Sequence, residues 1–393
     1  MIKILLGGSP CTHWSIAQKH DRETQPNSGL GWELFLNYKI ALEKYKPDYF
    51  LYENNKSASG AIKDEICKQL GSPLQYINSA LVSAQNRERF YVHNWECPLP
   101  QDKGILLKDV LEHGVVDKEK AYCLCSSHTG TTRNYFKKQQ SQIVFEQIRF
   151  PEYGKPDKAR PLNAYYSNNC GGWEKRVFSD NPNKQQVDLI AEPIRLGDIG
   201  SSSQAHRVYS PYGKSVTLSA NGGGQGGKTG LYFVSIPDEL LSLVHDKGKI
   251  YRVSDGKIGT KFGEFTISLP DGYYLIRKLT VNECKRLQTV PDWYEFPVKN
   301  TQAYKMLGNG WTIDVITHQL SYIPNILNEE IEVLSMYDGM SCGQIALKEM
   351  GCKVVKYYAT EIDKYAIQTT QHNFPNTIQL GDAFRVRESG WSL

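Results

Sequence analysis

The chain has 393 residues, of which 40% are hydrophobic and 22% are charged, and its formal net charge is +4 at pH 7. This composition is that of a globular protein with room for two domains. No apolar run is long enough to cross a bilayer and no signal peptide is visible, so we expect a cytoplasmic protein that does not bind membranes. The nine cysteines include no CxxC pair, which argues against both a metal site and a disulfide framework.

The first expected element is a buried strand over Ile2–Leu6, which is mostly apolar. Gly7, Gly8 and Pro10 end this strand and leave Cys11 at its exit. In an open α/β sheet the chemistry collects beyond the carboxyl ends of the strands. Cys11 therefore stands where a nucleophile would be expected.

An alternation of helices and strands follows and predicts a doubly wound α/β sheet. The expected elements are a helix over 31–46, a strand over 49–52, a helix over 59–70, a strand over 74–78 and a last strand that opens with Gln85–Tyr91. Glu53 follows the second of these strands, and Arg87 and Arg89 stand where the last one opens. Residues 1–94 are expected to form one half of a catalytic domain.

From Trp95 to Leu275 the alternation is lost, and short β-like pieces are separated by turn residues. We therefore expect a smaller, mostly β domain over 95–276. Helical spacing returns over 277–291, and a further helix is expected over 303–323. The remainder of the catalytic domain is expected over 277–393.

The last part of the chain contains a pattern typical of nucleotide binding. A strand over Ile331–Met336 runs into the glycine turn Asp338-Gly339-x-x-Cys-Gly343, and a helix follows. Glu361 ends the next strand, at the spacing of a carboxylate that binds a ribose diol. Asp382 ends the strand after that and could accept a hydrogen bond from an adenine amino group. Since no GxGxxG fingerprint is present, the pattern favours an adenosine cofactor without a pyrophosphate.

Several segments of the chain resemble the ordered motifs of the cytosine-5 DNA methyltransferases. They are GGSPC, ENN, QNRER, RKLTVNECKRLQTVP, AYKMLGNG, VLSMYDGMSCG, ATEID and GDA. In that family the cofactor motifs come first, whereas here they come last. The chain therefore resembles a circularly permuted member, with a Rossmann-like sheet for S-adenosylmethionine and a smaller target-recognition domain. Because permutation is tolerated at exposed junctions, Met1 and the tail near Leu393 are expected on the same edge of the catalytic domain.

The resemblance implies a mechanism for the residues at the strand ends. The Cys11 thiolate would add to C6 of cytosine and make C5 nucleophilic, while Glu53 would hydrogen-bond to or protonate N3. Arg87, and more loosely Arg89, would hold the carboxylate, the base carbonyl or the adduct. C5 would then take the methyl group of S-adenosylmethionine. The target cytosine would have to leave the base stack to reach these groups.

The resemblance also implies contacts to the cofactor and to DNA. The residues expected at the cofactor are Pro10, Asn309, Gly310, Trp311, Tyr337, Asp338, Gly339, Met340, Ser341, Cys342, Gly343, Glu361, Ile362, Asp382 and Ala383. Those expected at the DNA are Gln204, Arg207, Thr217, Ser219, Gly222, Gly223 and Gly224. Taken alone, the turn at Asn309-Gly310 can equally be a helix cap, and a bare glycine run can be a flexible loop.

These implications give the function hypothesis. We expect a methyltransferase that acts on double-stranded DNA as a monomer and either has a cognate restriction endonuclease or is an orphan or phage enzyme. An RNA cytosine-5 methyltransferase is one alternative, and the large β domain argues for duplex DNA instead. A catalytically silent DNA-binding homologue is the other, and the intact Cys11, Glu53 and Arg87 argue against it. The insertion over 235–274 has no counterpart in the resemblance.

Overall fold

The computed structural model describes residues 1–10, 13–14, 22–124, 132–139, 142–148, 195–198, 207–209, 231–232, 250–260 and 262–393. The chain divides into two compact units, one made of Met1–Phe145 with Arg277–Leu393 and the other of Glu146–Ile276. The first unit thus includes Trp95–Phe145, which the sequence assigns to the β domain. The domain boundaries expected from the sequence stay a prediction.

The first unit is built on a seven-stranded sheet. In the order in which they lie side by side, its strands are β15 (Ile378–Gly381), β14 (Lys353–Thr360), β13 (Glu330–Met336), β1 (Ile2–Gly7), β2 (Tyr49–Asn55), β4 (Glu88–His93) and β3 (Leu74–Asn78). The neighbours from β15 to β2 pair in parallel, whereas β4 pairs antiparallel with both β2 and β3. This is the Rossmann-like arrangement that the sequence predicts.

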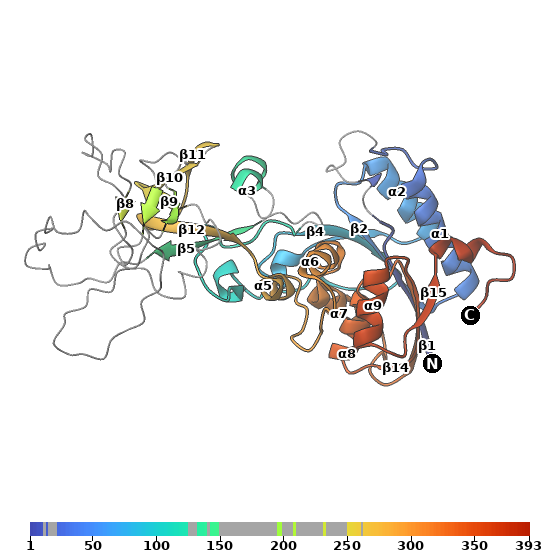
Figure 1. Cartoon of the computed structure of the whole chain (residues 1–393). Coiled ribbons are helices and arrows are strands. Elements are labelled where there is room, and N and C mark those ends of the chain that lie inside the picture. Colours follow the sequence, from blue (N-terminus) through green and yellow to red (C-terminus); the bar gives the residue numbers. More distant parts are fainter. Residues whose placement is uncertain are drawn as a thin grey trace, which may run out of the picture. The chain divides into compact units, whose positions relative to one another are not determined.

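Helices cover both faces of this sheet (Figure 1). The helices of the first unit are α1 (Leu30–Tyr45), α2 (Gly60–Leu70), α3 (Thr132–Lys138), α5 (Val281–Leu287), α6 (Asn300–Asn309), α7 (Ile313–Ser321), α8 (Cys342–Glu349) and α9 (Lys364–Asn373), with 3-10 turns η2 (Ser79–Leu81), η3 (Leu107–Val110) and η6 (Ala383–Arg387). Helices α1 and α2 pack on the face that presents Leu5, Tyr52 and Leu334. Helices α5 to α9 pack on the face that presents Leu6 and Val333.

The first strand of the chain lies in the middle of the sheet, beside β13. Strand β1 pairs in parallel with β13 from Ile2 opposite Ile331 to Gly7 opposite Met336. Near the end of α1, Lys3 Nζ lies 5.0 Å from the centre of the Tyr45 ring, and Lys44 Nζ donates a hydrogen bond of 2.8 Å to the Glu388 carbonyl. Lys3 and Glu388, which are close to the two ends of the chain, therefore both lie near the end of α1.

Two predicted helices are shorter than their apolar spacing suggests. The segment 277–291 yields only α5, because Arg277 and Lys278 belong to β12 (Gly272–Lys278) and Thr280 caps the helix. The segment 303–323 is divided into α6 and α7, because the backbone of Gly310 is extended (φ −65°, ψ 164°) and ends α6. Likewise, β4 begins at Glu88, so Gln85 and Arg87 lie in the turn before the strand.

The second unit contains short strands. They are β6 (Arg195–Asp198), β7 (Arg207–Tyr209) and β8 (Leu231–Tyr232) in one sheet, and β9 (Ile250–Ser254), β10 (Lys257–Thr260), β11 (Gly263–Thr266) and β12 with β5 (Ile143–Ile148) in another. The described residues of this unit are thus in β-strands and turns, in line with the mostly β character predicted for the region. Across all the described residues, every helix is too short or too polar to cross a membrane.

A buried ion pair joins two parts of the first unit. Glu283 is fully buried and accepts two hydrogen bonds of 2.8 Å from the Arg277 guanidinium. Its carboxylate also accepts from the backbone N–H groups of Thr280 and Glu112. Although burial alone would raise the pKa of Glu283, these donors lower it below its usual value. Residue 283 thus anchors both the start of α5 and the loop at residue 112.

Replacing Glu283 by Gln should lower the free energy of unfolding by about 3–5 kcal/mol at pH 7, because the Arg277 guanidinium would lose the buried carboxylate that it pairs with. Since a lowered carboxyl pKa adds stability above the unfolded pKa and loses it as pH falls, the difference should shrink below about pH 4. Urea unfolding at both pH values measures it. Glu43→Gln, in the Lys39–Glu43 pair with a Glu43 side chain 62% exposed, is the control and should change stability by less than about 1 kcal/mol. Equal losses in the two variants would contradict the anchoring role.

Candidate active site

The candidate residues follow a single row of paired strand positions. Gly381 pairs with Thr360, Thr360 with Met336, Met336 with Gly7, and Gly7 with Tyr52. This row crosses β15, β14, β13, β1 and β2 at their carboxyl ends. The residues that come directly after it are Asp382, Glu361, Tyr337, Gly8 and Glu53. The strand register therefore brings the predicted cofactor and catalytic residues to one edge of one sheet.

Glu53 is held by an ion pair and a hydrogen bond from different elements. Because side chains alternate along paired strands, Glu53 on β2 shares a face with Arg89 on β4, and Glu53 Oε1 lies 3.2 Å from Arg89 Nε. Its other oxygen, Oε2, accepts a hydrogen bond of 2.9 Å from Trp311 Nε1. Glu53 is only 9% exposed. Burial raises its pKa above the usual value, although Arg89, Arg87 and Trp311 act in the opposite direction.

Arg87 bonds to backbone carbonyls rather than to the Glu53 carboxylate. It is buried, and its guanidinium donates to the carbonyl oxygens of Leu124 (3.3 Å), Gly308 (3.2 Å) and Gly310 (2.8 Å). These bonds fix the turn that follows α6 next to the sheet edge. Arg87 thus acts on Glu53 in two ways. Its charge lowers the pKa of Glu53, and its hydrogen bonds hold the turn that carries Trp311.

Cys123 contacts the cluster formed by Glu53, Arg87 and Arg89, and the sequence did not reveal this. Arg87 Nη1 lies 3.4 Å from its sulfur atom, and Arg89 Nη2 lies 3.8 Å from it. Burial alone would raise the pKa of the Cys123 thiol, but the two arginines outweigh burial and lower it. Its neighbourhood in sequence has no motif, so only the folded chain brings this sulfur to the arginines.

The predicted nucleophile Cys11 lies outside the described residues. The chain leading to it is anchored at Ser9, whose hydroxyl lies 2.7 Å from Tyr52 Oη and whose carbonyl accepts 2.8 Å from Asn54 Nδ2. Gly8 passes so close to Glu53 that a Cβ there would stand 2.6 Å from the Glu53 carbonyl oxygen. The ENN motif thus has a second role, since Asn54 holds the strand exit while Glu53 faces the cluster.

The glycine turn after β13 is closed by Glu361. Tyr337, Gly339 and Ser341 all have φ near 60° (60°, 59° and 60°), a region that non-glycine residues rarely adopt. Glu361 Oε2 accepts 2.8 Å from the Gly339 N–H, and its Oε1 accepts from Ile362 N and Asp363 N at the same distance. The carboxylate of Glu361 is therefore fixed at the mouth of the turn.

The residues beside this carboxylate fit an adenosine cofactor. Ile362 is 74% exposed and Phe384 is 36% exposed, so two large apolar side chains lie at the surface here. The exposed Asp382 stands next to them, because Thr360 and Gly381 pair. An apolar surface flanked by two carboxylates suits a nucleoside, whose ribose hydroxyls and base amino group are hydrogen-bond donors. A Cβ on Gly339 would meet no atom of the described residues within 4 Å.

Other predicted cofactor residues differ in exposure. Pro10, Asn309, Ile362 and Asp382 are exposed, Gly310, Trp311, Tyr337, Gly339 and Glu361 are half-buried, and Asp338, Met340, Ser341, Cys342, Gly343 and Ala383 are buried. Gly343 packs against the sheet, since a Cβ there would stand 2.5 Å from Leu6 Cδ1. A Cβ on Gly310 would come within 3.3 Å of Met340 Sδ and 3.2 Å of Cys342 Sγ. The turn after α6 is therefore packed directly against the glycine turn.

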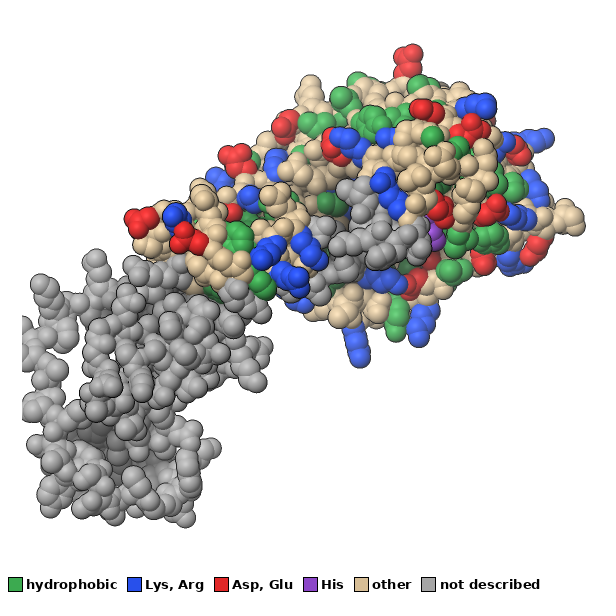
Figure 2. Space-filling model, turned by 90° about the horizontal axis from the view of Figure 1, so that it is seen from above, with side chains coloured by type: hydrophobic (Ala, Val, Ile, Leu, Met, Phe, Trp, Pro, Cys, Tyr) green, Lys and Arg blue, Asp and Glu red, His purple; other side chains and the backbone are tan. Residues whose placement is uncertain are grey.

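Most of the predicted DNA contacts cannot be placed. Gln204, Thr217, Ser219, Gly222, Gly223 and Gly224 lie outside the described residues, and Arg207 begins β7. On the face shown in Figure 2, basic and acidic side chains of the first unit are interspersed. This face has no single basic field, in keeping with a net charge of only +4.

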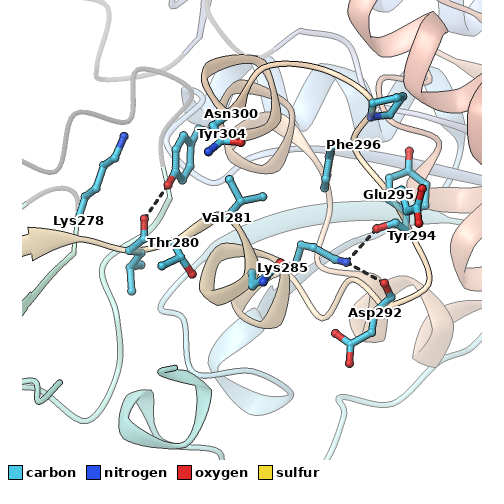
Figure 3. Close-up of a pocket in the computed structure, with 13 residues that line it drawn as sticks. Lys278, Thr280, Val281, Lys285, Asp292, Tyr294, Glu295, Phe296, Asn300 and Tyr304 are labelled. Carbon is cyan, nitrogen blue, oxygen red and sulfur yellow. Dashed lines mark hydrogen bonds between the residues drawn. The ribbon is translucent and has the colours of Figure 1, made fainter. Parts of the chain in front are cut away.

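A separate pocket of about 730 Å³ contains none of the predicted site residues. It lies between α5, α6 and the chain from Asp292 to Pro297 (Figure 3). At its wall, the buried Lys285 donates to the carbonyls of Asp292 (3.1 Å) and Tyr294 (2.8 Å), and Tyr304 donates to the Leu279 carbonyl. The Lys285 ammonium and the Tyr304 hydroxyl are thus hydrogen-bonded to backbone carbonyls of the pocket wall.

Comparison with known proteins identifies relatives for most of the chain. A family model described as C-5 cytosine-specific DNA methylase matches residues 1–324. The type II methyltransferase M.HhaI of Haemophilus parahaemolyticus is 30% identical over 146 residues, which are 37% of this chain and 33% of that protein. The orphan methyltransferase M.SPRI of Bacillus phage SPR is 24% identical over 370 residues and 80% of each chain. The chain thus matches about a third of the length of M.HhaI. Among solved structures, the S. pombe Dnmt2 methyltransferase aligns over 83% of this chain and 78% of its own, with 14% identity and a TM-score of 0.31.

Replacing Gly8 by Ala should destabilise the site, because the new Cβ would clash with the Glu53 carbonyl and come within 3.1 Å of its Oε2. We expect a loss of about 1–3 kcal/mol in the free energy of unfolding, measured by urea titration. Gly60→Ala at the start of α2 is the matched control, because a Cβ there meets nothing within 4 Å; its stability should stay unchanged or rise by up to about 1 kcal/mol. A tolerated Gly8→Ala would show that the strand exit has more room than the structure gives it.

Asp338→Asn should stabilise the protein at high pH. Burial raises the pKa of Asp338 to about 6, so its charge costs stability above that pH, whereas below about pH 4 the carboxyl is neutral in the folded and unfolded states alike. Asn keeps the acceptor for Tyr357 Oη, now 2.9 Å from Asp338 Oδ1. The gain should reach up to about 3 kcal/mol at pH 8 and shrink as the pH falls toward 4, by urea unfolding at each pH. A gain that does not depend on pH would refute the burial argument.

Proposed function

The chain belongs to the C-5 cytosine-specific DNA methylase family, and on this premise we propose that it transfers a methyl group from S-adenosylmethionine to C5 of a cytosine in double-stranded DNA. The observation that carries the proposal is the row of strand ends, because it brings Glu53, the exit toward Cys11 and the glycine turn with Glu361 to one edge of one sheet. An enzyme that joins a base to a nucleoside cofactor needs both sites within reach of each other.

Cys11 is the nucleophile in this proposal. Its thiolate forms a bond to C6 of the cytosine, and the electrons of the C5–C6 double bond shift toward C5 and N3. After methyl transfer the C5 proton passes to solvent, the C5–C6 double bond forms again, and the C6–S bond breaks to release the thiolate. Glu53 donates a hydrogen bond or a proton to N3 while charge develops there. A buried carboxyl with a raised pKa suits this role, because burial favours its protonated form. Arg87 and Arg89 supply positive charge beside the adduct.

The cofactor residues would hold the nucleoside end of S-adenosylmethionine, which when bound supplies an activated methyl group. Glu361 would accept from the ribose hydroxyls, since its carboxylate is already oriented at the mouth of the glycine turn. Asp382 would accept from the adenine amino group, and the exposed Ile362 would cover the base. Each of these roles uses a group that protrudes from the sheet edge.

Double-stranded DNA is the proposed substrate, with the target cytosine turned out of the duplex to reach Glu53. The second unit is the proposed recognition part, with Gln204, Arg207 and Thr217 as candidate contacts. We also propose a cytoplasmic location, because the spacing of the nine cysteines supports no disulfide framework.

We propose that the motif order of this chain is a circular permutation of the family order. Two contacts support this. The strand before the glycine turn, β13, pairs along its length with β1, and the amino group of Met1 lies 3.1 Å from the carboxylate of Glu329, just before β13. A sheet of this kind needs the cofactor strands and the catalytic strands side by side, and it does not depend on which of them is translated first.

Cys11→Ala should abolish transfer of a radiolabelled methyl group from S-adenosylmethionine to DNA while DNA binding persists, because the variant keeps the fold and loses the thiolate. Glu53→Gln should reduce transfer by about 10²–10⁴-fold, the usual contribution of a positioned acid or base. Duplex DNA containing 5-fluorocytosine should form a covalent adduct with the natural protein and none with Cys11→Ala.

The control is Cys352→Ala, whose half-buried thiol has a raised pKa through burial and should leave transfer unchanged. Retained turnover in Cys11→Ala would refute the mechanism. Labelling of tRNA in place of DNA would refute the proposed substrate.

A further inference from the structure

We propose that Trp311 is a positioning residue for Glu53, and that the turn carrying it links that carboxylate mechanically to the glycine turn of the cofactor site. The inference deepens the proposed function and rests on it for the role of Glu53. It concerns a bond between two named side chains, so it can be tested apart from methyl transfer.

The indole N–H of Trp311 donates a hydrogen bond to the Glu53 carboxylate, which also forms an ion pair with Arg89. Trp311 Nε1 lies 2.9 Å from Oε2, and Arg89 Nε lies 3.2 Å from Oε1. Arg89 lies on β4, and Trp311 lies on the turn between α6 and α7. Because an indole nitrogen can only donate, its bond stabilises the ionised carboxylate and not an oxygen that carries a proton. When Glu53 gives or takes a proton at Oε2, this bond must therefore break or form.

The turn that carries Trp311 has little room to move. Arg87 Nη2 donates 2.8 Å to the Gly310 carbonyl, and Gln288 Nε2 donates 3.2 Å to the same oxygen. On the other side, the Trp311 carbonyl lies 3.8 Å from Cys342 Sγ, at the start of α8. A displacement of Cys342 must therefore be passed to Trp311.

The partner of that turn is the cofactor loop itself. Met340 and Cys342 belong to the glycine turn that Glu361 closes, and a Cβ on Gly310 would already press on both sulfur atoms. If a ligand displaces the glycine turn, Gly310 must move with the turn or its packing must oppose the displacement. The same contact then reaches Glu53 through the indole ring, because Gly310 and Trp311 are consecutive.

Several ionisable groups also act on Glu53, and their effects have to be separated from that of Trp311. Those that pair with it or couple to it electrostatically are Arg87 and Arg89 before and on β4, Tyr91 on β4, Tyr52 on β2 and Cys342 on α8. Trp311 itself does not titrate. Its N–H therefore reports on the charge of Glu53 without adding a charge of its own.

Trp311→Phe removes the N–H and keeps an aromatic ring. The chain supplies a matched control in Trp293, whose Nε1 donates 2.8 Å to Glu349 Oε1 on the surface. Trp293→Phe deletes the same kind of indole–carboxylate bond at a position outside the site. Glu53→Gln removes the titrating group and keeps the size of the side chain.

The primary experiment is ¹⁵N NMR of the indole groups in the full chain, which has seven tryptophans. The Trp311 signal is assigned by its loss in Trp311→Phe. We expect this signal to shift with pH as Glu53 titrates and to become independent of pH in Glu53→Gln. We also expect it to move when S-adenosylhomocysteine is added at saturation, whereas the Trp293 signal should not. A Trp311 signal that ignores pH, or responds to pH equally in Glu53→Gln, would overturn the hydrogen bond; one that ignores S-adenosylhomocysteine at saturation would overturn the link.

The second measurement is the pH dependence of kcat/KM for methyl transfer. Trp311→Phe should move the alkaline limb, on which Glu53 loses the proton that it offers to N3, to higher pH, because the ionised carboxylate loses a donor. The variant should also lower kcat at neutral pH by about tenfold, the effect of one hydrogen bond to a charged group. Trp293→Phe should change neither. A raised KM for S-adenosylmethionine with an unmoved alkaline limb would assign Trp311 to cofactor contact alone and overturn the proposal. If no methyl transfer is found at all, the NMR titration still decides the bond, so the two failures can be distinguished.

Discussion

The buried carboxylate of Glu53 is the constraint on which the rest of the sheet edge depends. A buried charge without partners costs several kcal/mol, so the fold has to bring cations and donors to it. Arg89 supplies the ion pair from β4, and Trp311 supplies a hydrogen bond from the turn after α6. Arg87 fixes that turn by donating to its Gly310 carbonyl. The turn between α6 and α7 and the strand β4 thus each supply a partner for this carboxylate.

The register of the parallel strands places the Glu53 carboxylate beside the cofactor residues. Shifting β1 against β13 by one residue would reverse every side chain of the strand, and the apolar residues on both faces of β1 oppose such a shift. With the observed register, the exit of β1 passes over Glu53 while the exit of β13 opens into the glycine turn. The catalytic and cofactor residues are thus neighbours although the chain separates Glu53 from Glu361 by most of its length.

The elements with strong local signals were predictable. Strands β1, β2, β3 and β13 and helices α1 and α2 follow their apolar periodicity and their caps, as where Ser59 accepts from Ile62 N–H at the start of α2. The predictions over 277–291 and 303–323 were wrong in extent. There the apolar spacing continues past the point where pairing of β12 and the extended backbone of Gly310 end the helix. Periodicity reports which face is buried, and tertiary contacts decide where an element stops.

The sequence by itself determined the residue types at the strand ends, their order along the chain and therefore the family. Those signals are local, since a glycine turn, a strand-end carboxylate and an Arg-x-Arg pair each occupy a few consecutive residues. The tertiary structure decided what these groups touch. It turned Arg87 toward backbone carbonyls, brought Cys123 between two guanidinium groups and set the indole of Trp311 on Glu53. These contacts join residues far apart in the chain, and their partners are chosen by packing and by the need to satisfy buried polar groups, which no spacing in the sequence encodes.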